Sequence, residues 1–408
     1  MSVLTCIPKV VGADSPVPVP TGLLPYANFD YAASAPCLES VQEAVTRALP
    51  YYSSVHRGAG YASQVTTRAY EEARESVRAF LGGPQAVVFT RNTTDSFNLL
   101  ARALPAPTSV VVFESEHHAT QLPWRGAVRL PVPASPIEAL RAADAALKAC
   151  PQGPRLLVVT AASNVTGELW PVHELADVAH RNGARIAVDA AQLAPHRPLD
   201  ASDLDYVALS GHKLYAPFGA GVLAGRADWL RAADPYLKGG GASRKVGSGG
   251  RVEWASDAEQ RHEAGTPNVL GAIALAAACT ALTGWDDLVA EEERLLGRLR
   301  AGLAELPEVR ELSLWGADHP RVGIVSFTVA GHPARSVAEY LSNEHGIGVR
   351  DGKFCAHPLV RHLVGGTGRA EGCTDPDATA VRASIGLGTT DEHVDRLIAA
   401  LRALTEQT

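Results

Sequence analysis

The chain has 408 residues, a length that suggests about two or three domains. Apolar residues make up 46% of it and charged residues 20%, which is typical of a globular protein and excludes a disordered chain. Its 37 Lys and Arg against 44 Asp and Glu give a formal net charge of −7, so electrostatics provides no case for binding nucleic acid or an anionic membrane surface.

The cysteines and the N-terminal segment indicate a cytoplasmic protein. The six cysteines form no C-x-x-C pair, which argues against a disulfide framework or a zinc ribbon and favours a reducing compartment. The uncharged stretches are shorter than the roughly 18 apolar residues that span a bilayer. Met1–Leu24 is proline-rich and lacks the pattern of a signal peptide. We therefore expect a flexible arm at residues 1–24, no membrane partner and a cytoplasmic location.

Helical and strand patterns alternate from about residue 63 to 225. A period near 3.6 predicts helices at Ser63–Leu81, from Pro136 to about Lys148, and from Pro171 to Arg181. Short apolar runs predict six strands, at Ala86–Phe89, Val110–Phe113, Leu156–Thr160, Arg185–Asp189, Tyr206–Leu209 and Gly221–Ala224. Continuous apolar strands separated by helices indicate an α/β fold with a mostly parallel sheet covered on both faces.

The pattern changes in the last third of the chain. The glycine-rich stretch at residues 239–250 predicts a mobile loop. A charged helix from Glu292 to about Glu305 is followed by predicted strands at Gly323–Val329, Gly348–Arg350 and Arg382–Ile385, with a helix between the first two and a final helix capped by Thr390. We expect a large domain at residues 25–290 and a smaller α+β domain at 291–408, to which residues of about 25–40 contribute.

Ligands of such sheets bind beyond the carboxyl ends of the strands, so the polar residues there are the candidates for a site. The chain has no G-x-x-x-x-G-K-[ST] loop and no H-E-x-x-H helix, and His117 and His118 have no further residues at metal-ligand spacing. Asp189 ends one predicted strand, and Lys213 follows the next predicted strand along the chain. A lysine that forms a Schiff base and a carboxylate that keeps a pyridine nitrogen protonated are what pyridoxal phosphate needs, although such a pair can also be a structural salt bridge.

The segment Ser210-Gly-His212-Lys213-Leu-Tyr-Ala-Pro-Phe-Gly resembles the Schiff-base segment of the class V aminotransferase family, and within it of the SufS-type cysteine desulfurases and selenocysteine lyases. The resemblance runs from Asn28 to about Leu404, and its motifs occur in the family's order. They are Phe29-Asp30-Tyr31-Ala-Ala-Ser-Ala, Val55-His56-Arg57-Gly58, Thr90-Arg91-Asn92-Thr93-Thr94, Glu116-His117-His118-Ala, Ser163-Asn164-Val165-Thr-Gly, Val188-Asp189-Ala-Ala-Gln192, Glu263-Ala-Gly265-Thr266-Pro267-Asn268, Cys355-Ala-His-Pro-Leu and Val381-Arg382-Ala-Ser.

This resemblance implies pyridoxal 5'-phosphate fold type I, with a mostly parallel seven-stranded sheet in the large domain and a smaller α+β domain. It implies that Lys213 forms the Schiff base and moves the Cα proton, and that Asp189 pairs with the pyridine nitrogen. It also implies that His117 stacks on the cofactor ring and that Gln192 and Asn164 contact the phenolic edge of that ring. The residues implied to hold the phosphate are Thr93, Thr94, Ser210 and His212. Helix capping is the alternative role for either threonine.

The resemblance further implies a homodimer, because Thr266 matches the family residue that reaches the partner subunit's phosphate. Arg382 resembles the arginine that clamps the substrate carboxylate, and Asn164 borders the same place; His56 and Arg350 are candidates for the rim. Cys355 stands where cysteine desulfurases carry the nucleophile that takes sulfur from the substrate. The loop reads Arg350-Asp-Gly352-Lys353-Phe354-Cys355 where SufS-type enzymes usually have Arg-x-Gly-His-His-Cys, which puts the persulfide step in question.

Three functions remain open on this basis. The first is a cysteine desulfurase or selenocysteine lyase that converts L-cysteine into L-alanine and a persulfide on Cys355, and passes sulfur to an acceptor protein. The second is a C–S β-lyase or an aminotransferase of the same fold, in which Cys355 is a bystander. The third is a catalytically idle protein, which the presence of Lys213, Asp189 and Arg382 argues against.

Overall fold

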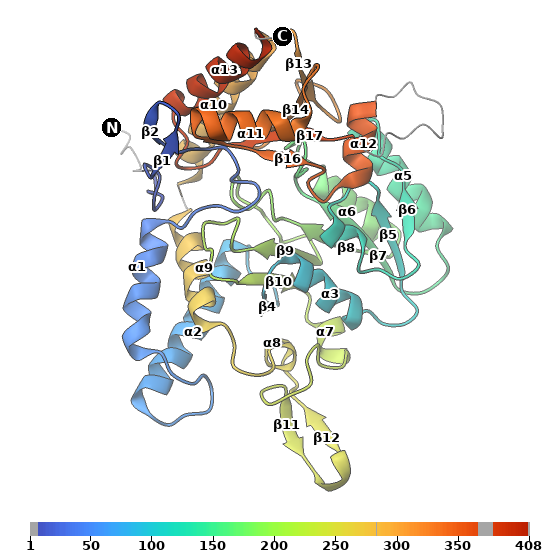
Figure 1. Ribbon diagram of the computed structural model, residues 1–408. Helices are drawn as coiled ribbons and strands as arrows, with labels where there is room; N and C mark the ends of the chain where they lie inside the picture. Colours follow the sequence, from blue (N-terminus) through green and yellow to red (C-terminus); the bar gives the residue numbers. More distant parts are fainter. Residues whose placement is uncertain (1–6, 283, 366–377, 407–408) are drawn as a thin grey trace.

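The computed structural model describes residues 7–282, 284–365 and 378–406. A large α/β region carries a central sheet, and a smaller sheet with its own helices lies above it in the view of Figure 1. Cys6 and Cys373 lie outside the described residues.

The central sheet has seven strands in the order β4-β10-β9-β8-β7-β5-β6. They are β4 (Ala86–Thr90), β5 (Ser109–Phe113), β6 (Val128–Leu130), β7 (Arg155–Thr160), β8 (Arg185–Asp189), β9 (Tyr206–Ser210) and β10 (Gly221–Gly225). Only β10 runs antiparallel to its neighbours β4 and β9, so the expected mostly parallel sheet is confirmed. The six strands expected from the sequence are all present; β6, which is short and mostly exposed, has no apolar run to mark it.

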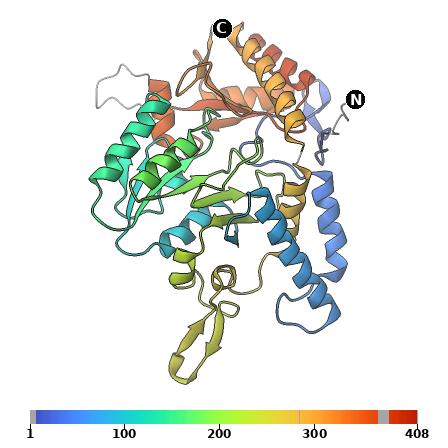
Figure 2. The same ribbon diagram turned by 180° about the vertical axis from the view of Figure 1, so that it is seen from behind.

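Successive residues of these strands point to opposite faces, and each face has its own apolar core. Val110 and Val112 pack into one core, while Val111 and Phe113 pack into the other. The first core includes residues of α3 (Thr93–Ala103), α7 (Asp228–Ala232) and α8 (Ala258–His262). The second includes residues of α1 (Glu39–Ala48), α2 (Tyr61–Phe80), α5 (Pro136–Ala149), α6 (Val172–Arg181) and α9 (Val269–Ala281). Helices therefore cover both faces (Figures 1 and 2).

The smaller sheet is antiparallel throughout, in the order β13-β14-β17-β16. Its strands are β13 (Val309–Leu312), β14 (Ile324–Val329), β17 (Ala380–Ser384) and β16 (Arg350–Gly352), and α10 (Trp285–Ala304), α11 (Ala334–His345) and α13 (Asp391–Thr405) share their core with it. The short strand β15 (Ile347–Gly348) pairs in parallel with β3 (Ala27–Asn28), which brings the N-terminal segment to the smaller sheet. The domain boundaries stay a prediction, and α10 runs across position 290.

Two segments that we expected to be irregular contain strands. Within the predicted arm, β1 (Pro16–Val19) pairs with β2 (Gly22–Pro25) in a two-stranded ribbon. Proline has no backbone N–H to donate, and an edge strand tolerates it because one of its sides needs no hydrogen bond to another strand. Residues 239–250, expected to be a loop, contribute β11 (Ser243–Val246), which pairs with β12 (Val252–Trp254) across a turn at Gly249 and Gly250, both with positive φ. This hairpin projects from the body in Figure 1.

The long helix α10 begins at Trp285 and not at Glu292, because Asp286 and Asp287 supply the acidic first turn that favours a helix start. Two single-turn helices, η1 (Leu49–Tyr51) and η2 (Ser248–Gly250), and the short helices α4 (His118–Gln121) and α12 (His357–Gly365) complete the described elements. Over the described ranges no single helix is long and apolar enough to cross a membrane, although α9 and α10, bent by 83°, meet that criterion when taken together.

Candidate active site

Polar side chains gather where β5, β7, β8 and β9 end, because the carboxyl ends of parallel strands meet at one edge of a sheet. Asp189 is the last residue of β8, and Ser210 is the last residue of β9, three positions before Lys213. A Cβ on Gly211 would lie 2.6 Å from the Ala220 carbonyl oxygen, so only glycine fits this turn.

The Asp189 carboxylate is buried and held at both oxygens. Its Oδ2 accepts a hydrogen bond from the Thr120 hydroxyl at 2.8 Å, and its Oδ1 accepts one from the Ala191 amide at 2.9 Å. Burial raises the pKa of Asp189, and the charge of Lys213 opposes this rise. A fixed carboxylate that is poorly solvated is suited to pair with a cationic ring nitrogen.

Lys213 has an amine that is unusually easy to deprotonate. Burial lowers its pKa to about 8, the Asp189 carboxylate raises it, and the Arg382 guanidinium lowers it further. The charge of Cys355 also acts on Lys213 and raises its pKa. About a tenth of an amine with this pKa is neutral at pH 7, far more than of an ordinary lysine, so it is available as a nucleophile or base.

A hydroxyl cluster forms where β4 meets α3. The Ser210 Oγ accepts a hydrogen bond from the Thr93 amide at 2.9 Å and lies 2.9 Å from the Thr93 Oγ1. Asn92 caps α3 by accepting from the Asp95 amide, so neither threonine serves as the cap. Thr93 is buried and Thr94 exposed, and hydroxyls at a helix N-terminus are suited to hold a phosphate.

His212 lies beside this cluster, and its Nδ1 is 3.3 Å from the Ser34 Oγ. Burial, and then the charge of Lys213, lowers the pKa of His212.

His117 is a neutral imidazole with a defined tautomer. Burial lowers its pKa to about 3, and the charges of Lys213, His118 and Arg382 lower it further. Its Nδ1 accepts a hydrogen bond from the Ala119 amide at 3.0 Å, so the proton of the neutral ring is on Nε2. A neutral, fixed aromatic ring beside Lys213 can stack on a cofactor ring.

Gln192 and Asn164 are buried amides of the same site. The Gln192 Nε2 donates to the Ala32 carbonyl at 2.8 Å, whereas its Oε1 has no partner among the described residues. The Asn164 Nδ2 donates to the Phe354 carbonyl at 2.7 Å and thereby ties the loop after β7 to the Cys355 loop. A buried, unpaired amide oxygen is a place where a bound group is expected to supply the missing donor.

Arg382 connects the smaller sheet to this site. It is buried on β17, and its Nη1 donates to the Asn164 carbonyl at 2.9 Å while its Nη2 lies 3.3 Å from the Asp30 carboxylate. Its Nε has no partner among the described residues. Burial lowers its pKa to about 10, and Asp30 raises it. Arg350 is exposed and lies 3.9 Å from the other Asp30 oxygen, at the edge of the same cluster.

Cys355 stands on a tight turn between β16 and α12. Both Phe354, with φ of 50°, and Cys355, with φ of 53°, adopt the left-handed region although neither is glycine. The His118 amide donates to the Cys355 carbonyl at 2.8 Å. The Cys355 side chain is exposed, and its charge acts on both Lys213 and Arg382.

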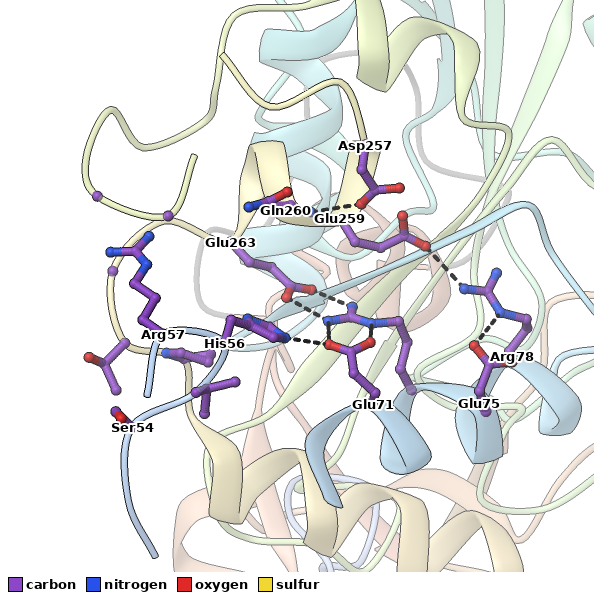
Figure 3. A pocket seen from close by; sticks show the side chains of 17 residues that line it. Ser54, His56, Arg57, Glu71, Glu75, Arg78, Asp257, Glu259, Gln260 and Glu263 are labelled. Carbon is purple, nitrogen blue, oxygen red and sulfur yellow. Dashed lines mark hydrogen bonds and ion pairs between the residues drawn. The ribbon is translucent and has the colours of Figure 1, made fainter. Parts of the chain in front are cut away.

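Two predicted site residues lie elsewhere. His56 and Thr266 line a cavity of about 660 Å³ between α2 and the segment that follows α8 (Figure 3). There the His56 Nε2 is 2.7 Å from the Glu71 Oε1, and Arg57 borders the same cavity. The structure therefore does not bring His56 to the rim beside Arg382, and the roles of His56 and Thr266 stay predictions that depend on a partner subunit.

Sequence reasoning missed two residues that the structure adds to the site, Thr120 and Asp30. It gave no role to a third, Glu116, which was a candidate because it is polar and follows a predicted strand. Glu116 is fully buried, its Oε1 accepts from the Thr160 amide at 3.1 Å, and burial raises its pKa well above the ordinary value. Asp30 belongs to a motif that marked the family, so its place in that motif was the available signal. Thr120 had none, since its partner Asp189 is remote in sequence.

The fold and the residues around Lys213 define an enzyme of pyridoxal phosphate fold type I. The chain belongs to the class V aminotransferase family, because residues 27–397 match the family model described as "Aminotransferase class-V". The chain is 36% identical over 398 residues to a cysteine desulfurase of Klebsiella pneumoniae, a match that covers 93% of each chain. It is 33% identical over 404 residues to a cysteine desulfurase of Escherichia coli, covering 93% of this chain and 94% of that one.

Solved structures agree with this assignment. The apo structure of a cysteine desulfurase from Thermococcus onnurineus matches with a TM-score of 0.83 and 31% identity, over 94% of this chain and 95% of that chain. An Escherichia coli cysteine desulfurase, in an S-sulfonic acid form, matches with a TM-score of 0.78 and 33% identity over the same shares. The expected family and fold class are therefore confirmed.

Proposed function

We propose that the chain is a cysteine desulfurase that takes sulfur from L-cysteine, releases L-alanine and leaves a persulfide on Cys355. The observation that carries this proposal is the meeting of three distant segments. Asn164 donates to the Phe354 carbonyl, next to Cys355, and accepts from Arg382, and the charges of Arg382 and Cys355 both act on Lys213. A base, a carboxylate clamp and a thiol are the three groups that the reaction needs. The names of the relatives support the same activity.

The proposal includes pyridoxal 5'-phosphate, and the residues present fit it. The Asp189 carboxylate would pair with the ring nitrogen, and the neutral His117 imidazole would stack on the ring face. The unpaired Gln192 Oε1 would contact the phenolic edge, and the Thr93 and Ser210 hydroxyls would hold the phosphate. Lys213 is the amine that would hold it. When bound, this cofactor supplies an electron sink for charge that develops at the substrate Cα.

The side chains then have separate tasks. Arg382 binds the substrate carboxylate, for which its unpaired Nε is available. Lys213 Nζ accepts the Cα proton and later returns one. The Cys355 thiolate attacks the substrate sulfur, so that an S–S bond forms and the substrate Cβ–S bond breaks. The electron pair of that bond stays on the carbon fragment, which takes up a proton and leaves as alanine.

The test is product analysis with L-cysteine on wild-type protein, on Cys355→Ser and on a matched control, Cys37→Ser. Cys37 is a half-buried thiol whose pKa is raised by burial, so its loss should change nothing. We expect alanine and a protein-bound persulfide from the wild type and the control, and neither from Cys355→Ser. Pyruvate, ammonia and sulfide that survive the Cys355→Ser change would instead identify a C–S β-lyase, and a requirement for a keto acid an aminotransferase.

The proposal extends to partners. A homodimer is supported by Thr266, which lies in a cavity apart from Lys213 although its motif is the one that reaches a cofactor phosphate. A sulfur-acceptor protein is supported by the exposure of Cys355, because a persulfide there stays accessible to a second thiol. A cytoplasmic location fits this reduced-thiol chemistry.

A further inference from the structure

Two histidines from remote parts of the chain meet beside Cys355. The rings of His118 and His357 lie edge to face, with centroids 4.5 Å apart and an interplanar angle of 66°. His118 is the first residue of α4, in the large α/β region, and His357 is the first residue of α12, which follows the Cys355 turn. Both histidines were visible in the sequence, His118 at a strand end and His357 close to Cys355, but their contact was not, and the proposed function gives neither imidazole a role.

Both histidines are fixed relative to Cys355 by the backbone. The His118 amide donates to the Cys355 carbonyl at 2.8 Å, and the Ala356 amide donates to the Lys353 carbonyl at 2.9 Å, which closes the turn that leads into His357. Cys355 and His357 are exposed and His118 is half-buried. The Cys355 thiol and the His357 imidazole are therefore both open to solvent.

Both cationic side chains and imidazoles surround the Cys355 turn. The cations Lys213, after β9, and Arg382, on β17, both interact with the charge of Cys355, and Lys353 stands on the same turn. Burial, and then the charge of His357, lowers the pKa of His118. His118 is therefore neutral near neutral pH, and a neutral imidazole has a ring nitrogen that can accept a proton.

We propose that the His118–His357 pair accepts the proton of the Cys355 thiol and holds it beside the thiolate. The S–H bond breaks, an N–H bond forms on an imidazole, and the electron pair stays on Sγ, so the step needs no further reactant. The resulting imidazolium stabilises the thiolate electrostatically. This inference rests on the proposed function, in which Cys355 is the nucleophile. It assigns the activation of that nucleophile to His357, at the start of the helix after the Cys355 turn, together with His118 from the large α/β region.

The test measures the reactivity of Cys355 without any substrate. The reduced holoenzyme is treated with iodoacetamide from pH 5.5 to 9.5, and alkylation of Cys355 is followed by peptide mass spectrometry. We expect His357→Gln and His118→Gln to raise the midpoint of the Cys355 profile by about one pH unit, and thus to slow alkylation at pH 7 about tenfold. His357 is exposed, so its substitution leaves the fold intact, and both variants keep the amide of residue 118.

The matched control is His173→Gln, which removes an exposed imidazole from α6 that pairs with Asp203. A midpoint that stays unchanged in His357→Gln, or that shifts equally in His173→Gln, overturns the inference. Alkylation does not depend on alanine formation. A shifted profile in a protein that makes no alanine would support the pair and refute the proposed function, whereas an unshifted profile in an active desulfurase would do the reverse.

Discussion

At the scale of single residues, the environment of the site changes what ordinary side chains can do. Lys213 is an amine with a lowered pKa, His117 is held neutral, and Arg382 keeps a donor without a partner among the described residues. Each effect comes mainly from burial, and neighbouring charges then adjust it. These residues therefore yield predictions that differ from those for the same side chains in water.

The lowered pKa of Lys213 predicts how apoprotein takes up pyridoxal phosphate. Only the neutral amine attacks an aldehyde, so the rate of uptake should rise with pH through a midpoint of about 8. The measurement is the absorbance change on mixing apoprotein with the cofactor between pH 6.5 and 11. Lys213→Arg should take up none covalently, while Lys238→Arg, at an exposed lysine paired with Asp234, should behave as wild type. A midpoint near 10.5, the ordinary value, would contradict the prediction.

We expect loss of the Arg382 guanidinium to weaken substrate binding even when a lysine replaces it and keeps the positive charge. Arg382→Lys should raise KM for L-cysteine about tenfold or more, with a smaller effect on kcat, because an ammonium cannot form the two parallel hydrogen bonds of a guanidinium. Steady-state kinetics of alanine formation measures both constants. Arg350→Lys is the control, since Arg350 is exposed and 3.9 Å from its nearest carboxylate oxygen, and its KM should stay close to that of wild type. Equal KM values for all three proteins would exclude Arg382 as the clamp.

At the scale of elements, one buried carboxylate holds three segments together. Glu263, after α8, accepts hydrogen bonds from the Arg74 guanidinium on α2 at 2.7 and 2.8 Å, and from the Tyr70 hydroxyl and the Phe89 amide at 2.7 Å each. Figure 3 shows Glu263 pointing toward α2. The segment that leads to Thr266 starts at this anchor, so its position depends on the pair with Arg74.

Loss of this carboxylate should be costly because it leaves the buried Arg74 guanidinium with only the half-exposed Glu71 as a charge partner. Glu263→Gln is expected to lower the free energy of unfolding by about 3 kcal/mol. The measurement is the urea midpoint, read from the circular dichroism of wild type and variant. Glu43→Gln is the control: its pair with Arg47 lies on the surface, with side chains 69% and 71% exposed, and should contribute less than about 1 kcal/mol. Similar midpoint shifts for the two variants would refute the role of Glu263.

At the scale of the whole molecule, the face formed by α1, α2 and the segment between them exposes several large aromatic side chains. Tyr51, Tyr52 and Tyr61 are about half or more exposed near α1 and α2, and a cavity of about 310 Å³ lies among Tyr51, Tyr52 and residues of α1, α2 and α9. The three helices run side by side in Figures 1 and 2. An apolar patch of this kind commonly marks a protein interface.

This face predicts where the proposed homodimer forms. The double substitution Tyr51→Glu with Tyr52→Glu should convert dimers into monomers at micromolar concentration, because it places charges in a dry interface. Light scattering after size exclusion measures the mass. Leu122→Glu, which changes another exposed apolar side chain, should leave the dimer intact. A double variant that remains dimeric would place the interface elsewhere.

Most regular elements were predictable because their signals are local. The 3.6-residue period marked α2, α5 and α6, and apolar runs marked six of the seven central strands. Elements without such a signal were missed. The β1–β2 ribbon and the β11–β12 hairpin rest on the pairing of proline- or glycine-rich segments, and such pairing is set by the partner strand and not by composition.

The sequence by itself determined the family, the fold class and the identity of the groups at the strand ends, because motif order and apolar periodicity are properties of the chain. Only the tertiary structure decided which of these groups meet. It joined Arg382 to Asp30 and Asn164, set His118 against His357, and placed His56 and Thr266 in a separate cavity. Such contacts depend on strand order and on how two sheets pack, and no local pattern encodes either of them.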